Sequence, residues 1–227
     1  MKKFAIATAI ASLFASAAAT ATPFVWGNVY TDVLVNENAS VKESQIIGIE
    51  GGVVTDTTKV YGFFEHNPDL ENQFGKVTIH RKVIEDFGVY AHGTAFKEGV
   101  FAEGRYVLGA GYTGLSGEGW EINPYLGFTR IETSFDEDTF SINNSTDNVA
   151  FGYAGYYTVQ PGTTLSSWAD ARVDSDDDNK VKVQSSIGIQ HDLIGQVYIG
   201  AFYNMNYGEQ GQKHFSDSVQ LRVGYHF

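Results

Sequence analysis

The chain has 227 residues, no cysteine and a formal net charge of −12, with 27 acidic side chains against 15 basic ones. The absence of cysteine excludes a disulfide framework and a thiolate metal site. The acidic balance argues against nucleic acid as a partner, because phosphate binding requires clustered Lys and Arg.

The first residues show the three parts of a secretory signal peptide. Lys2 and Lys3 provide the positive start, an apolar core runs from Phe4 to Phe14, and small residues offer cleavage sites after Ala19 or Ala21. The apolar core is shorter than the roughly 20 residues that a membrane-spanning helix needs. We therefore expect residues 1–21 to be a signal peptide and residues 22–227 to form one mature domain.

From residue 24 onward the hydrophobic pattern has a period of two, and clusters of Gly, Asn, Asp and Ser separate segments of roughly ten residues. That length is typical of tilted strands that cross a membrane, and the mature chain has no apolar run approaching about 18 residues. The pattern predicts an all-β fold, a single antiparallel transmembrane β-barrel of about twelve strands. Ten strands are the alternative, if the short segments around 76–81 and 87–96 merge or drop out. The predicted strands are 24–35, 45–54, 57–67, 74–82, 86–96, 100–113, 119–132, 148–159, 164–173, 181–191, 196–207 and 217–227.

The connections differ in length and charge. Those near 134–147 and 174–180 are long and acidic, and we predict that they are extracellular, whereas the tight connections at 160–162 and 193–195 are predicted to be periplasmic. The run 174–178 lacks the glycine and the terminal glutamate of a calcium loop, so a solvated loop is favoured over a calcium site. Aromatic residues near the strand ends suit the membrane interface, namely Tyr112, Tyr156, Tyr157, Tyr207, Tyr225 and Phe227.

The last segment has the clearest alternation, with Gln220, Arg222, Gly224 and His226 between apolar or aromatic residues. Its apolar face ends on Phe227, which resembles the terminal signature by which the assembly machinery recognises outer-membrane barrels. This resemblance predicts the outer membrane of a Gram-negative bacterium, with its lipid and lipopolysaccharide and the assembly machinery as partners.

If the apolar parity faces lipid, the opposite parity lines the lumen, where side chains contact whatever passes or binds. Rings on this face offer stacking surface, and charges offer hydrogen bonds to the polar edges of a small amphipathic solute. Inward pairs of arginine and carboxylate are also the means by which a narrow barrel satisfies its own charges and plugs itself. The residues predicted to line the lumen are Trp26, Asn28, Tyr30, Asp32, Lys59, Tyr61, Phe63, Glu65, Glu103, Arg105, Trp168, Asp170, Arg172 and Arg222.

The sequence nominates no catalytic group. The six histidines lie on different predicted strands without a Ser-His-acid grouping, so we expect no enzyme activity and no cofactor. His80 and His92 could meet across neighbouring strands, but the pattern offers no nearby third ligand for a metal ion.

Two segments resemble a known family. The stretch from Ile46 to Gly52, followed by Lys59-Val60-Tyr61-Gly62-Phe63-Phe64-Glu65, is similar to paired strands of the nucleoside-specific channel family of outer-membrane proteins, which also includes a phage receptor. The first strand, with Phe24-Val25-Trp26, and the ending Gly224-Tyr225-His226-Phe227 are compatible with it. The resemblance implies a monomeric twelve-stranded barrel with a narrow lumen through which nucleosides diffuse. It implies binding roles for Glu50, Tyr61, Phe63 and Glu65.

Three functions follow as hypotheses. The first is a passive channel for a small solute, favouring a nucleoside, with Tyr61, Phe63 and Trp168 stacking on bases. In it Glu50, Glu65, Arg105 and Arg172 hold the sugar and base edges. The second is a closed structural or adhesive barrel whose acidic loops contact a phage or a host. The third is a barrel enzyme acting on lipid or peptide, for which no residue is nominated.

Overall fold

The computed structural model describes residues 23–36, 44–134, 144–174, 180–207 and 217–227. The predicted signal peptide and the acidic runs 136–138 and 175–178 lie outside the described residues. In the part of the chain that the structure describes, no helix is long and apolar enough to cross a membrane.

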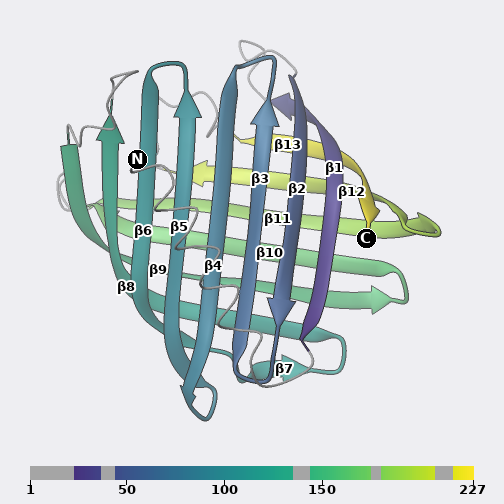
Figure 1. Ribbon diagram of the computed structural model, residues 1–227, viewed down its shortest axis with the longest axis horizontal. Coiled ribbons are helices and arrows are strands. Elements are labelled where there is room, and N and C mark those ends of the chain that lie inside the picture. The colour runs from purple at the N-terminus through teal and green to yellow at the C-terminus, as the bar shows by residue number, and fades with distance from the viewer. Residues whose placement is uncertain (1–22, 37–43, 135–143, 175–179, 208–216) are drawn as a thin grey trace.

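The described residues form thirteen strands in one sheet (Figure 1). The strands are β1 (Phe24–Asn36), β2 (Ser44–Val54), β3 (Thr58–Asn67), β4 (Asn72–Ile84), β5 (Phe87–Glu98), β6 (Phe101–Tyr112), β7 (Leu115–Gly117), β8 (Trp120–Ser134), β9 (Asn144–Gln160), β10 (Thr163–Asp174), β11 (Lys180–Ile194), β12 (Val197–Tyr207) and β13 (Ser218–His226).

Twelve of these strands close into an antiparallel barrel. β6 pairs with β8, and β13 pairs with β1 from Asn28 opposite His226 to Asn36 opposite Ser218, so the sheet has no free edge in the wall. The prediction of a twelve-stranded barrel is confirmed. The ten-strand alternative is wrong, because the weakly patterned segments form the full strands β4 and β5. The short β7, which pairs only with β8, was not predicted.

The two parities of the strands make two different surfaces. Leu108, Leu126 and Phe128, on the paired strands β6 and β8, are 64%, 60% and 76% exposed on the outer face. Their neighbours Val107 and Thr129 point inward and are 3% and 2% exposed. An apolar exterior around a polar and aromatic interior is the arrangement expected of a barrel surrounded by lipid.

The two ends of the barrel also differ. Tight turns at 161–162 and 195–196 use glycines with positive φ, 76° at Gly162 and 64° at Gly195. Strand direction puts these turns at the same end, while the strand ends flanking residues 37–43, 135–143, 175–179 and 208–216 lie at the other, together with the shorter connections 68–71 and 99–100. Since outer-membrane barrels have short periplasmic and longer extracellular connections, this asymmetry agrees with the predicted orientation.

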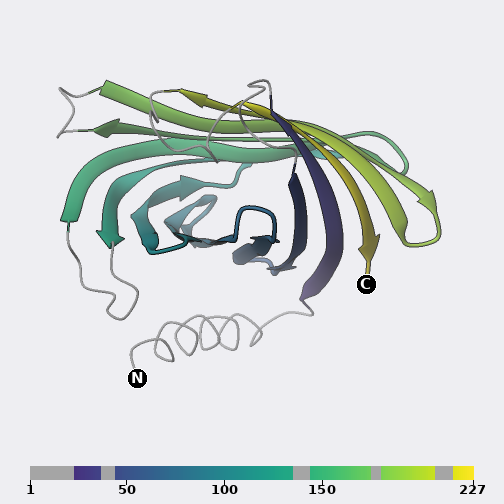
Figure 2. The ribbon, with the colours of Figure 1, turned by 90° about the horizontal axis from the view of Figure 1, so that it is seen from above.

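The barrel is flattened. Strands β2 to β6 form one layer and β8 to β12 cross behind it at a steep angle, as tilted strands on opposite walls do (Figure 1). Seen from above, the two layers lie close together (Figure 2). Twelve tilted strands on a circle would give a diameter of about 24 Å. Instead, Lys76 of β4 contacts Asp170 of β10 directly, although their side chains together span only about half that distance.

Glycines allow inward rings to lie flat against the wall. A Cβ atom on Gly48 would lie 2.2 Å from Cζ of Tyr30, and one on Gly224 would lie 2.3 Å from Cζ of Tyr198. Neither position tolerates a side chain without displacing the ring. The rings therefore cover the inner wall of neighbouring strands, a packing that also protects the exposed backbone of glycine in a strand.

Candidate functional site: the lumen

All the residues that the sequence analysis assigned to the lumen have the inward parity. The register places Asp32 opposite Arg222, Trp26 opposite Gly52, and Trp168 opposite Ser186. A role in binding a solute remains a prediction for each of them. The inward set comprises Trp26, Asn28, Tyr30, Asp32, Glu50, Lys59, Tyr61, Phe63, Glu65, Glu103, Arg105, Trp168, Asp170, Arg172 and Arg222.

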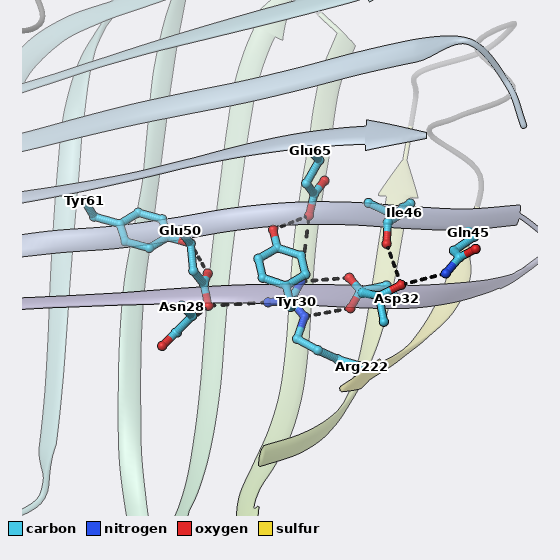
Figure 3. A network of polar contacts seen from close by, with 10 residues as sticks. Asn28, Tyr30, Asp32, Gln45, Ile46, Glu50, Tyr61, Glu65 and Arg222 are labelled. Carbon is cyan, nitrogen blue, oxygen red and sulfur yellow. Dashed lines mark hydrogen bonds and ion pairs between the residues drawn. The ribbon is translucent and has the colours of Figure 1, made fainter. Parts of the chain in front are cut away.

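One arginine organises the wall where the barrel closes (Figure 3). Arg222 of β13 donates from Nε and Nη2 to the two carboxylate oxygens of Asp32, both at 2.8 Å. Its guanidinium also lies 3.5 Å from Glu50 and 3.7 Å from Glu65. We refer to Arg222, Asp32, Glu50 and Glu65 as the Arg222 network. It joins the last strand to the first three.

Neighbouring polar groups complete the Arg222 network. Asn28 Nδ2 and Tyr61 Oη each donate to Glu50 at 2.9 Å, and Tyr30 Oη donates to Glu65 at 2.8 Å. The Arg222 guanidinium lies 3.5 Å from the centre of the Tyr30 ring. Each carboxylate therefore already has at least two polar contacts, which is how charges removed from water are tolerated.

A run of four rings lies beside this network on the inner wall. Trp26 and Tyr61 are stacked, with ring centres 5.8 Å apart and planes 24° apart. Tyr61 to Phe63 measures 6.1 Å, and Phe63 meets Phe74 edge-on at 5.3 Å. The rings come from three strands, β1, β3 and β4, and provide a continuous aromatic surface.

Three basic side chains, Lys76, Lys59 and Arg105, make contacts across the lumen between the two layers of the described strands. The Lys76 ammonium lies 2.9 Å from Asp170 and 5.0 Å from the centre of the Trp168 ring. Lys59 of β3 pairs with Glu121 of β8 at 2.5 Å. The third contact joins β6 to β11, with Arg105 Nη1 3.3 Å from Gln184 Oε1, while Arg105 also pairs with Glu103 on its own strand. Together they narrow the interior.

A second aromatic cluster lies inside β4, β5 and β8. Tyr90 and Tyr125 are stacked at 3.9 Å, bridging over β6. Tyr90 also lies between the two histidines, 4.5 Å from the His80 ring and 5.6 Å from the His92 ring. The two imidazoles thus meet a tyrosine rather than each other. Among the described residues no group of three or more His, Asp or Glu side chains is arranged to hold a metal ion.

Beside this cluster the lumen holds an internal cavity of about 10 Å³, which is close to the space of one water molecule. It is lined by Arg105, Val107, Thr129, Ala150, Asp170, Ala171 and Arg172. The interior is therefore tightly packed at this level.

Sequence reasoning missed several inward residues that take part in these contacts, above all Lys76, His92, Glu121, Thr129 and Gln184. Their signal was present as strand parity. In β8, for example, Glu121 and Thr129 alternate with the outward residues Ile122 and Phe128. What parity could not show is which side chains meet across the lumen.

No protein-family model matches the chain, and no curated protein is significantly similar to it in sequence. The fold is similar to that of solved outer-membrane porins. The NanC porin is 7% identical, with 87% of this chain and 97% of that chain covered and a TM-score of 0.55. The KdgM porin is 6% identical, with 88% and 98% covered and a TM-score of 0.50. At these identities the likeness shows a porin-type barrel fold, and the resemblance to the nucleoside-specific family stays a prediction.

Proposed function

We propose that the protein is a channel in a Gram-negative outer membrane, through which small polar solutes diffuse passively, with nucleosides as the favoured substrate. The observation that carries the proposal is the inner wall of a closed barrel, which combines a run of stacked rings with charged and hydrogen-bonding groups. An apolar exterior and the porin-type fold agree with this location and role.

The aromatic run supports a solute with a flat face. Rings at 5 to 6 Å spacing, from Trp26 through Tyr61 and Phe63 to Phe74, would let a base exchange one stacking partner for the next without strong binding at any of them. Facilitated diffusion requires such weak, repeated sites, because a solute that binds tightly does not leave.

Single-channel recording of the purified protein in a planar bilayer tests the proposal. We expect a small conductance that millimolar uridine reduces and that glucose does not. Phe63→Ala should weaken the block by uridine, because it interrupts the aromatic run. Val223→Ala, on the outer face of β13, is the matched control and should leave the block unchanged.

A closed barrel acting at the cell surface is the second candidate, and the contacts across the lumen favour it. The pairs Lys76–Asp170 and Lys59–Glu121 join opposite layers directly. If these pairs never part, no current passes under any condition. The acidic extracellular loops, as contacts for a phage or a host, then become the functional surface.

A further inference from the structure

The lumen contains two kinds of polar group, those whose polar atoms have hydrogen-bond partners and those with a buried polar atom that has none. In the Arg222 network the carboxylates of Asp32, Glu50 and Glu65 all have close partners, so little capacity is left for a solute. On the far side of the lumen the situation is reversed. Four buried side chains there carry a polar atom without a hydrogen-bond partner among the described residues, namely His92 Nε2, Tyr125 Oη, Thr129 Oγ1 and Gln184 Nε2.

These atoms are deeply buried and belong to one region. The four side chains are 4%, 8%, 2% and 9% exposed, in the same order. Thr129 lines the small cavity together with Asp170, and Gln184 is directly opposite Asp170 on the neighbouring strand. The His92 and Tyr125 rings are 5.9 Å apart. We define His92, Tyr125, Thr129, Asp170 and Gln184 as the Thr129 site.

Burying a polar atom without a partner is costly, so such an atom in a native protein calls for an explanation, of which a bound water, ion or other molecule is one. One water molecule in the cavity of about 10 Å³ can bond to Thr129, which lines it, whereas His92, Tyr125 and Gln184 do not line this cavity. Room for a larger molecule depends on Lys76, whose ammonium covers Asp170 and Trp168. Lysine holds this position on a flexible four-carbon stem, so it can swing away without moving the wall.

We propose that the Thr129 site is the solute-binding site of the lumen, and that it takes an uncharged solute rich in hydroxyl and amide groups when Lys76 moves aside. The proposal rests on the proposed channel function and deepens it. The donors and acceptors of Thr129, Gln184 and His92 replace water around the solute, and the carboxylate of Asp170, released from Lys76, accepts a hydroxyl. A neutral solute fits because the unpaired atoms of Tyr125, Thr129 and Gln184 belong to uncharged side chains.

The test combines two readouts on the full chain purified from outer membranes. Trp168 lies against Lys76, so displacement of that ammonium should change tryptophan fluorescence as uridine or glucose is added, whether or not current flows. Single-channel recording of the same preparation measures block. Trp168→Phe establishes which part of the signal comes from this ring.

Thr129→Val keeps the shape of the side chain and removes its hydroxyl. Because that hydroxyl has no partner among the described residues, the thermal midpoint of unfolding should not fall. The uridine concentration for half-saturation should rise by a factor of about five, as expected for one lost hydrogen bond. Gln184→Met should act in the same direction. Thr158 also has the inward parity but lies on β9, at the end of the barrel away from Thr129. Thr158→Val is therefore the matched control and should titrate like the wild type.

The outcomes separate this proposal from the channel function. Weaker binding in Thr129→Val and Gln184→Met supports the site even if no current is found, in which case only the channel function fails. Channels that uridine blocks equally well in all variants keep the channel function and overturn the site. Absence of any fluorescence response to both solutes also overturns it, since the site would then hold water alone.

Discussion

Removing the charge of Arg222 should destabilise the barrel strongly. In Arg222→Met the Asp32 carboxylate, which is 0% exposed, loses both of its 2.8 Å hydrogen bonds and stays buried as an unpaired charge. Breaking one partner of a buried pair costs about 3 to 5 kcal/mol. The stacking of the guanidinium on Tyr30 at 3.5 Å adds about 1 kcal/mol to that loss.

Asp32→Asn should cost less, about 1 to 3 kcal/mol, because Arg222 keeps Glu50 and Glu65 nearby. In the double variant Arg222→Met, Asp32→Leu, no unpaired charge remains at position 32. Its loss should therefore be smaller than the sum of the losses from Arg222→Met and Asp32→Leu measured singly.

Urea unfolding in lipid vesicles, followed by tryptophan fluorescence, measures these free energies. The shift of the folded band on unheated gels gives an independent check. A loss below about 1 kcal/mol in Arg222→Met would refute the reasoning, because it would mean that water already reaches Asp32.

Three further predictions concern the interior, the glycines and the outer face. Lys76→Ala should at least double single-channel conductance, or open a closed barrel, because it removes the contact with Asp170, whereas Lys76→Arg should not. Gly48→Ala should destabilise the barrel by about 2 kcal/mol in urea unfolding, since its Cβ would lie 2.2 Å from the Tyr30 ring. Gly93→Ala, whose nearest neighbouring atom would lie at 3.8 Å, should be tolerated. Leu126→Arg should cost about 2 to 4 kcal/mol in vesicles, where Leu126→Val should be nearly neutral.

The strand number and the two faces of the wall could be read from the sequence because both depend only on period two. Each of the twelve predicted segments contains most of one barrel strand, and the last of them, 217–227, was assigned the correct inner face. The three-residue β7 was not predicted, because so short a segment shows no alternation of apolar and polar residues. Parity is a local property, so it survives without knowledge of the tertiary structure.

The alternation of residues along a strand could not predict which side chains bind each other across the lumen or between the last strand and the first. Lys76 and Asp170 are 94 positions apart, and Arg222 and Asp32 are 190 apart. Whether Lys76 meets Asp170 depends on the flattening and stagger of the whole barrel, which no single segment encodes. The pairing of Arg222 with Asp32 requires the register between the last strand and the first. Sequence reasoning therefore named both members of the second pair without showing that they bind each other.

The two polar regions of the lumen should respond differently to mutation. The Arg222 network is saturated and ties β13 to β1, β2 and β3, so its residues contribute chiefly to closing the barrel. The Thr129 site lies on β5, β8, β10 and β11 and retains unpaired donors and acceptors, so its residues contribute to contacts with a solute. Substitution of Thr129 can change selectivity at little cost in stability, because its hydroxyl has no partner among the described residues, whereas substitutions around Arg222 change stability first. Stability and solute binding should therefore vary independently in variants of the two regions.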